Sequence, residues 1–225
     1  MDRVELVVGV TQRFSTARTS AAGRATQLAA EALRGVIDDF ASEQDGPMSL
    51  AELARAAAGA GRPLVGTGRW TGTPRSVAFN VQAFRVAVNA GTGEIRILKS
   101  VHAADAGRVL NPMQCRGQIE GGVAQALGAT LYEELVIGPD GRVVNPSFRG
   151  YHIPAFGDVP RTEVLFADTV DQVGPYGAKS MSESPYNPVA AALGNALADA
   201  TGIRFTATPF KPDRLWPALQ EKFGE

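Results

Sequence analysis

The sequence predicts an α+β fold in which mixed sheets pack against helices. The segment 24–40 repeats apolar residues mostly at three- and four-residue spacing, and the alanine-rich segment 187–200 ends before Gly202, a typical helix C-cap. Between them, 79–88 and 95–102 alternate apolar and polar residues around a glycine-containing turn, which predicts a hairpin. Because these elements show no regular strand–helix–strand repeat, they indicate the α+β class.

Composition and charge narrow the classes of protein. With 225 residues, the chain can form one large or two small domains, and we expect a single unit, 1–225, with sub-lobes at 1–75 and 76–225. Hydrophobic residues make up 44% and the net charge is -1, so binding of nucleic acid through phosphate neutralisation is not expected. No apolar run reaches the length of a membrane span. The opening residues lack the pattern of a signal peptide, which predicts a cytoplasmic location.

The first third of the chain predicts two helices and a loop. The helix at 24–40 is followed by Ser49-Leu-Ala-Glu52, which has the form of a capping box and predicts a short helix that ends near Ala58. The stretch 59–74 contains five glycines and two prolines, so we expect it to be a loop.

The segment from Gln118 to about Tyr132 has the length of a helix but an unusual glycine content. Gly121, Gly122 and Gly128 each disfavour a helix interior by about 1 kcal/mol relative to alanine. Glycines at such positions indicate that something approaches the backbone closely. Two interpretations stay open: tight packing against another element, or contact with a ligand.

The remaining pattern predicts further strands. The turn Gly138-Pro-Asp-Gly141 lies within a second expected hairpin at 133–144. Two short strands are also expected, a buried one at 164–166 and a final one at 203–206.

Glu183 is the leading candidate for chemistry, because it lies in a loop rich in proline, glycine and serine that runs into a helix. Rigid loops often carry catalytic groups, whereas a lone loop glutamate is more often a solvated surface charge. The single cysteine, Cys115, excludes an internal disulfide and a cysteine-ligated iron–sulfur cluster within this chain. His102 and His152 are fifty residues apart, which is not the spacing of a local metal site.

Two polar segments precede expected helices, and each has alternative interpretations. Gln118 could donate its amide to a ligand alongside the free backbone N–H groups of a helix start. Thr19 and Ser20 end a hydroxyl-rich segment. Either could cap the following helix, or the hydroxyls could bind an anionic ligand such as a phosphate.

Several motifs occur in the order typical of one enzyme family. The most specific are Val101-His-Ala-Ala-Asp-Ala-Gly-Arg-Val-Leu-Asn-Pro112 and Gly117-Gln-Ile-Glu-Gly-Gly122, and the others are Ser15-Thr-Ala-Arg-Thr-Ser20, Tyr151-His-Ile-Pro154 and Gly174-Pro-Tyr-Gly-Ala-Lys179. Together they resemble the C-terminal part of the molybdopterin-binding large subunit of the xanthine dehydrogenase and aldehyde oxidase family. The resemblance covers nearly the whole chain and implies the α+β molybdopterin-binding domain of that family.

The resemblance implies a catalytic role for one residue. Glu183 falls where the family carries its general base, which activates a water-derived hydroxyl for attack on an electron-poor carbon. Gln118 would hydrogen-bond the cofactor beside the metal. No side chain is expected to ligate the metal, because the dithiolene of the pterin does so in the family.

The resemblance also implies further cofactor contacts. Thr19 and Ser20 would bind the polar or phosphate portion of the pterin cofactor. Gly121 and Lys179, which belong to two of the matching motifs, would complete the cofactor-binding set.

The implied protein is a component of a molybdenum hydroxylase that oxidises an aldehyde or an N-heterocycle. It would use molybdenum–molybdopterin, either in the simple form or as the cytosine dinucleotide. The rest of the molybdopterin-binding polypeptide, iron–sulfur clusters and FAD would reside in partner chains, without nucleic acid or a membrane. The alternative is a truncated, non-catalytic family member that serves as a folding or interaction module without cofactor. Ser180 and Ser182 stand where the family has glycine; this change disfavours a positive φ there, adds side chains beside Glu183, and favours the non-catalytic alternative.

Overall fold

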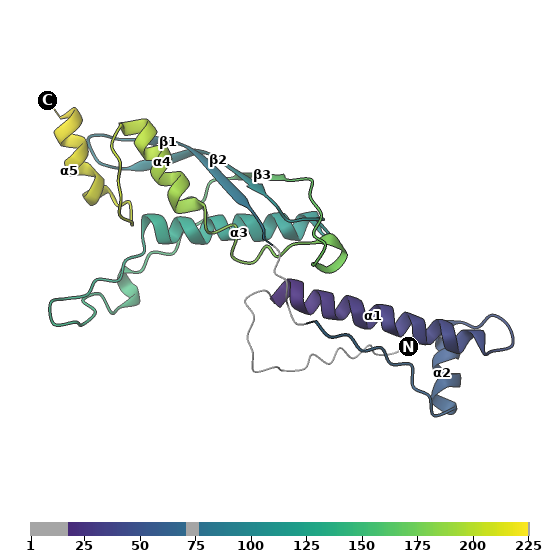
Figure 1. Cartoon of the computed structure of the whole chain (residues 1–225). Coiled ribbons are helices and arrows are strands. Elements are labelled where there is room, and N and C mark those ends of the chain that lie inside the picture. Colours follow the sequence, from purple (N-terminus) through teal and green to yellow (C-terminus); the bar gives the residue numbers. More distant parts are fainter. Residues whose placement is uncertain (1–17, 71–76, 225) are drawn as a thin grey trace. The chain divides into compact units, whose positions relative to one another are not determined.

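Two units make up the computed structural model, which describes residues 18–70 and 77–224 (Figure 1). The first unit comprises the chain up to Ser76 together with 170–180, and the second comprises 77–169 and the chain from Met181 onward. The side chains of 18–21 and the motif residues before Arg18 lie outside the described part. None of the described helices combines the length and the apolarity needed to cross a membrane.

The first unit is built on two helices. α1 (Arg18–Ser42) is longer than the predicted helix, and α2 (Leu50–Gly59) begins at the predicted capping box. In that box, Ser49 Oγ accepts a hydrogen bond from the backbone N–H of Glu52, and the Glu52 carboxylate accepts one from the backbone N–H of Ser49. The buried core of the unit consists of Phe40, Leu53 and Ala57.

The loop after α2 lies against α1 and depends on glycine. A Cβ at Gly66 would come within 2.3 Å of the carbonyl oxygen of Ala29, and one at Gly68 within 2.2 Å of that of Ala25. Both distances are shorter than atoms can approach, so the loop can follow the helix only because these residues have no side chain.

The segment that returns to the first unit packs on α1 through the 3-10 turn η2 (Pro175–Gly177). The backbone N–H of Tyr176 donates to Gln27 Oε1 at 3.1 Å. A Cβ at Gly174 would lie 1.8 Å from the carbonyl oxygen four residues later, and Gly177 has a φ of 88°. The two glycines of this motif are therefore required by the local backbone.

The second unit contains a three-stranded mixed sheet in the order β1-β2-β3. β1 (Asn80–Val88) and β2 (Ile95–Ala104) form the predicted antiparallel hairpin, and β3 (Thr162–Phe166) pairs with β2 in parallel. The α+β prediction with a mixed sheet is confirmed.

Three helices complete the second unit: α3 (Pro112–Leu131), α4 (Val189–Thr201) and α5 (Pro212–Phe223). Gly202, with a φ of 67°, ends α4 in the left-handed conformation, as predicted. The helices bury a common core with the inner face of the hairpin, and this core comprises Val123, Ala126, Leu127, Val189, Leu193, Leu197, Phe210, Leu215 and Leu219.

A row of polar side chains is buried in the sheet and links its three strands. His102 Nδ1 lies 2.8 Å from Gln82 Oε1, and His102 Nε2 lies 2.9 Å from Asn80 Oδ1. Gln82 Nε2 donates to Ser100 Oγ at 3.0 Å, and Ser100 Oγ lies 2.9 Å from Thr162 Oγ1. Burial lowers the pKa of His102, because desolvation disfavours the imidazolium ion.

Two predicted elements need correction, and one helix was not predicted. The hairpin at 133–144 is reduced to a single bridge between Ile137 and Val143, because the apolar side chains of this ribbon have no core to cover. The strand at 203–206 does not form, since its alternation reflects the packing of Ile203 and Phe205 on the core without ladder hydrogen bonds. α5 was not predicted, and its buried Leu215 and Leu219 lie four residues apart on one helix face.

Candidate functional site

Glu183 lies on a loop, 181–188, that is fixed at several points. Met181 is buried in a second core cluster, and Val189 is buried at the start of α4. Pro185 is fully buried between them, and the backbone N–H of Tyr186 donates to the Glu183 carbonyl at 3.0 Å. The carboxylate of Glu183 is nevertheless exposed. The loop therefore presents this carboxylate from a packed base, the arrangement that holds a functional group in a defined position.

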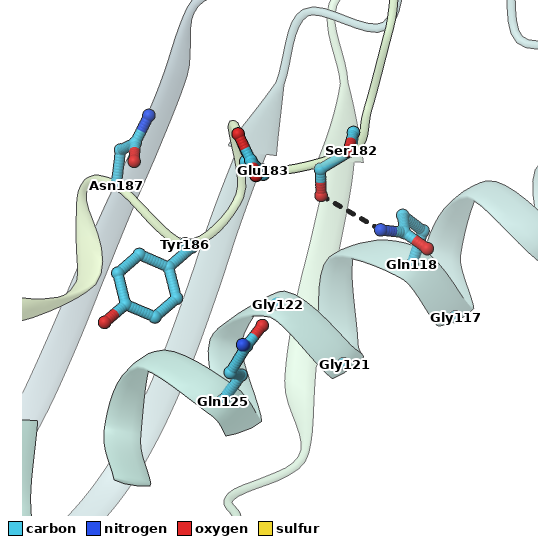
Figure 2. A pocket seen from close by; sticks show the side chains of 9 residues that line it. All are labelled: Gly117, Gln118, Gly121, Gly122, Gln125, Ser182, Glu183, Tyr186 and Asn187. Carbon is cyan, nitrogen blue, oxygen red and sulfur yellow. Dashed lines mark hydrogen bonds between the residues drawn. The ribbon is translucent and has the colours of Figure 1, made fainter. Parts of the chain in front are cut away.

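Gln118 connects this loop to α3. Its side-chain Nε2 donates to the backbone carbonyl of Ser182 at 2.9 Å (Figure 2). The predicted position of Gln118 at a helix start is wrong, because α3 begins at Pro112 after Asn111, whose Oδ1 accepts from the backbone N–H of Gln114 at 3.1 Å. Gln118 is therefore inside the helix, and the free N–H groups of a helix start are not beside it.

The glycines of α3 divide into two groups: one confirms the packing interpretation, and for the other the ligand interpretation stays a prediction. A Cβ at Gly122 would lie 3.0 Å from Pro185 Cβ, and one at Gly128 would lie 3.0 Å from Pro154, so these two serve close packing. A Cβ at Gly117 or Gly121 would meet nothing within 4 Å. Because these two are four residues apart, they leave one face of the helix bare.

That bare face, together with the Glu183 loop, forms a pocket of about 380 Å³. Figure 2 shows the side chains of Gln118 and Gln125 rising from α3 towards the loop that carries Glu183 and Tyr186. The full lining is Gly117, Gln118, Gly121, Gly122, Gln125, Ser182, Glu183, Tyr186 and Asn187.

Three lining residues were missed by the sequence analysis: Gln125, Tyr186 and Asn187. Gln125 follows Gln118 by seven residues and Gly121 by four, so helical spacing alone could have placed it on the same face. Tyr186 and Asn187 carry no such signal, because a loop has no fixed period.

The electrostatics of the pocket are simple. Glu183 is its one charged lining residue, and the other polar side chains in the lining are amides and hydroxyls. Ser184 Oγ, on the same loop, is buried and has no hydrogen-bond partner within the described part of the chain. In residues 18–70 and 77–224, no cluster of histidine, cysteine and carboxylate side chains could hold a metal ion.

The other predicted cofactor residues belong to the first unit. Thr19 and Ser20 lie in the first turn of α1, which begins at Arg18, so neither is the N-cap residue that one interpretation required. Lys179 follows η2 and is partly buried. The cofactor roles of these three residues remain predictions.

The backbone at the two distinctive serines is ordinary. Among the described non-glycine residues, only Tyr176 has a positive φ, so Ser180 and Ser182 adopt conformations open to any residue. Cys115, the single cysteine, is partly buried in α3 beside the second core cluster, and burial raises the pKa of its thiol.

The fold and this pocket define an α+β domain with an open pocket between a glycine-bearing helix and a carboxylate-bearing loop. In a comparison with known families, the model of the molybdopterin cofactor-binding domain matches residues 1–160. The chain belongs to this family.

Individual relatives agree with the family. The chain is 38% identical over 138 residues to the aldehyde oxidoreductase molybdenum-binding subunit PaoC of Escherichia coli (strain K12), which covers 60% of this chain and 19% of that subunit. It is 34% identical over 145 residues to the xanthine dehydrogenase molybdenum-binding subunit of Escherichia coli O157:H7, covering 64% of this chain and 19% of that subunit. The chain thus spans about a fifth of the length of these relatives.

The fold is shared with a solved oxidoreductase. Quinoline 2-oxidoreductase from Pseudomonas putida 86 superposes with a TM-score of 0.68 at 31% sequence identity, covering 78% of this chain and 24% of that one. The α+β domain of the molybdopterin-binding type, predicted from the motifs, is therefore confirmed.

Proposed function

We propose that this chain is a component of a molybdenum hydroxylase that introduces a water-derived hydroxyl group into an aldehyde or an N-heterocycle and passes the electrons to a partner iron–sulfur chain. The observation that carries the proposal is the shared pocket of Glu183, Gln118 and the bare glycine face of α3. Relatives of the chain are named as molybdenum-binding subunits of oxidoreductases, which supports the reaction class.

The residues present fit the molybdopterin cofactor. A flat pterin ring system needs a surface without side chains, and Gly117 and Gly121 provide one. Gln118 and Gln125 add amide groups that can donate to and accept from the ring edge. In this proposal Gln118 and Gly121 hold the cofactor, and Thr19, Ser20 and Lys179 keep their predicted roles as further cofactor contacts. When bound, the cofactor supplies the two-electron redox chemistry of the hydroxylation.

Glu183 serves as the general base. A carboxylate can take the proton from a water-derived hydroxyl only if it lies within hydrogen-bond reach of that oxygen. The buried Pro185 and the bond from Gln118 to Ser182 hold the loop on either side of Glu183 and restrict where its carboxylate can point. Since Glu183 is exposed, bound cofactor, substrate and partner polypeptide must supply the exclusion of water that strengthens such a base.

The ordinary backbone at Ser180 and Ser182 favours this function over a cofactor-free interaction module. Had either serine occupied a glycine-only conformation, the loop would be strained where the base is held. The serines instead add hydroxyl groups without distorting the chain.

The test is to express the chain together with the products of its neighbouring genes. Molybdenum content and aldehyde-dependent dye reduction would be measured for wild type and for Glu183→Gln. We expect Glu183→Gln to reduce turnover by a factor on the order of 10² to 10⁴ while molybdenum stays bound. Glu163→Gln, which alters an exposed carboxylate on β3 that pairs with Lys99, is the matched control.

Metal-free, inactive wild-type assemblies would support the interaction module instead. Loss of molybdenum in Glu183→Gln would assign Glu183 a structural role and reject it as the base.

A further inference from the structure

The segment 133–160 forms an extended arm that leaves the end of α3 in the second unit (Figure 1). Its apolar side chains are bare: Phe148 is 92% exposed and Phe156 is fully exposed. Four more large apolar residues of the arm are exposed by more than half, and these are Leu135, Ile137, Val144 and Ile153. Single exposed apolar residues are common on proteins, but six within one 28-residue segment form an unusual concentration.

The arm has an ordered backbone of its own. Its two sides are joined by hydrogen bonds from Val144 N–H to the Val136 carbonyl and from Gly138 N–H to the Arg142 carbonyl, both at 2.8 Å. Asn145 bridges them again, because its Nδ2 donates to a backbone carbonyl at 2.7 Å and its Oδ1 accepts from the Val136 N–H at 2.9 Å. The exposed side chains of Leu135, Ile137 and Val144 are therefore displayed on a defined ribbon.

The two roots of the arm are fastened to the rest of the second unit. At the first root, Glu134 pairs with both Lys211 and Arg214 at the start of α5. At the second, His152 packs edge-on against Tyr132 with ring centroids 4.2 Å apart. The ribbon is thus held at its base while its apolar side chains remain uncovered.

We propose that the arm docks against a molybdopterin-binding polypeptide, at a part of the family's large subunit that lies outside the region matched by this chain. This proposal rests on the proposed function for its choice of partner. The chain spans about a fifth of the length of the subunits it resembles, so in those proteins most of the polypeptide lies outside the matched region. Six large apolar side chains can bury roughly 800 Å², which is about what one partner contributes to a standard protein interface.

The charge of the arm favours a protein partner over a lipid surface. Residues 133–160 include four carboxylates and two arginines, which gives the arm a net charge of -2 with histidine neutral. Such a segment is repelled by anionic headgroups, which attract basic segments instead.

Site-specific photo-crosslinking tests the docking. Benzoylphenylalanine would replace Phe148 or Phe156, and in a control Phe223 of α5, in the chain co-expressed with its neighbouring genes. We expect the probes at 148 and 156 to form adducts with peptides of a molybdopterin-binding polypeptide. We expect the probe at 223 to form no such adduct. Adducts to a second copy of this chain, adducts to unrelated proteins or lipid, or no adduct would each overturn the proposal.

A double variant, Phe148→Ser with Phe156→Ser, gives an independent measurement. It should lower the amount of co-purified molybdopterin-binding polypeptide by about tenfold or more, whereas Phe223→Ser should not. Its melting temperature should be unchanged, because both side chains are already in solvent. If the double variant co-purifies as much of this polypeptide as the wild type does, the docking site is refuted and the proposed function still stands. Absence of molybdenum from a wild-type assembly that forms would refute the function and leave the docking site standing.

Discussion

The side-chain amide of Gln118 donates a 2.9 Å hydrogen bond to the backbone carbonyl of Ser182, the residue directly before Glu183. A helix side chain thereby fixes the backbone of a loop sixty-four residues later in the chain. Hydrogen bonds of this kind contribute about 0.5–1.5 kcal/mol to the state that forms them. That range is enough to bias where the loop holds its carboxylate.

Loss of this bond should loosen the loop. In Gln118→Leu, we expect the amide hydrogen of Tyr186, which donates to the Glu183 carbonyl, to exchange about two- to tenfold faster. Hydrogen-exchange mass spectrometry on 181–188 measures the effect. Gln114→Leu, on the same helix but outside the pocket lining, is the control. Equal exchange in wild type and Gln118→Leu would show that Gln118 does not hold the loop.

Two adjacent glycines of α3 should respond in opposite ways to alanine. Gly121→Ala adds a Cβ that meets nothing within 4 Å, so helix propensity should raise the free energy of unfolding by about 0.5–1 kcal/mol. Gly122→Ala places its Cβ 3.0 Å from Pro185 Cβ, so the Glu183 loop must shift and the gain should be lost or reversed. Urea denaturation compares the two.

The same pair separates stability from cofactor binding. If Gly121 holds the cofactor, Gly121→Ala should be the more stable protein and yet retain less molybdenum after purification. A stabilised Gly121→Ala variant with full molybdenum content would contradict a cofactor contact at this glycine.

Burial of His102 should make stability depend on pH. Because its folded-state pKa is lowered below the unfolded value near 6.5, the unfolded chain binds more protons in the window just below that pH. The stabilisation is complete above pH 6.5 and declines as pH falls, by at most about 1.4 kcal/mol per pH unit. Denaturant titrations between pH 5 and 7 should show this slope in wild type and lose it in His102→Gln.

Because the imidazole ring of His102 is neutral, its donor and acceptor nitrogens can be assigned. A neutral imidazole donates from one nitrogen only, and Gln82 Nε2 already donates to Ser100. Nδ1–H of His102 therefore donates to Gln82 Oε1, and Nε2 must accept. Asn80 Nδ2 is buried without a partner. If the Asn80 amide is rotated by half a turn, Nδ2 takes the place of Oδ1 and donates to His102 Nε2. Nitrogen NMR shifts of His102 typical of an Nδ1–H tautomer would agree, and those of an imidazolium at pH 7 would disagree.

Glu134 should control how firmly α5 is attached. The pKa of its carboxyl is lowered mainly by the hydrogen bond from Lys211, so the attachment holds above the usual glutamate pKa and weakens as pH falls through the lower folded value. Glu134→Gln should speed amide exchange in 212–223 at pH 7. The matched control is Asp140→Asn, which removes an exposed carboxylate at the tip of the arm.

Local signals predicted the fold well where they acted within a few residues. The Ser49 capping box, the hairpin at 80–104 and the C-cap at Gly202 all depend on neighbouring residues and are confirmed. Asn111 and Pro112 are the N-cap and first residue of α3, so this helix begins before the predicted start at Gln118. α5 escaped prediction because Pro212 and Pro217 read as helix breakers, while its apolar side chains are few.

The residues of the candidate site were likewise predictable only where a local signal exists. The ordered motifs point to Glu183, Gln118 and Gly121, and the pocket contains all three. The distinction between Gly121 and Gly122 depends on the distant Pro185, which no local pattern encodes. Tyr186 and Asn187 enter the lining because the loop folds over α3, a tertiary event without a sequence period.

The order of the units along the chain limits how the protein can be divided. The first unit includes 170–180. In this segment the N–H of Tyr176 donates a hydrogen bond to Gln27, and Pro175 packs so closely on α1 that a Cβ on Gly23 would lie only 2.8 Å from Pro175 Cγ. A fragment that stops at Ser76 would expose this side of α1, and a fragment that begins at Val77 would carry 170–180 with nothing to rest on. Neither fragment keeps all of these contacts, so dividing the gene or exchanging a domain at this boundary would disrupt the packing of the first unit.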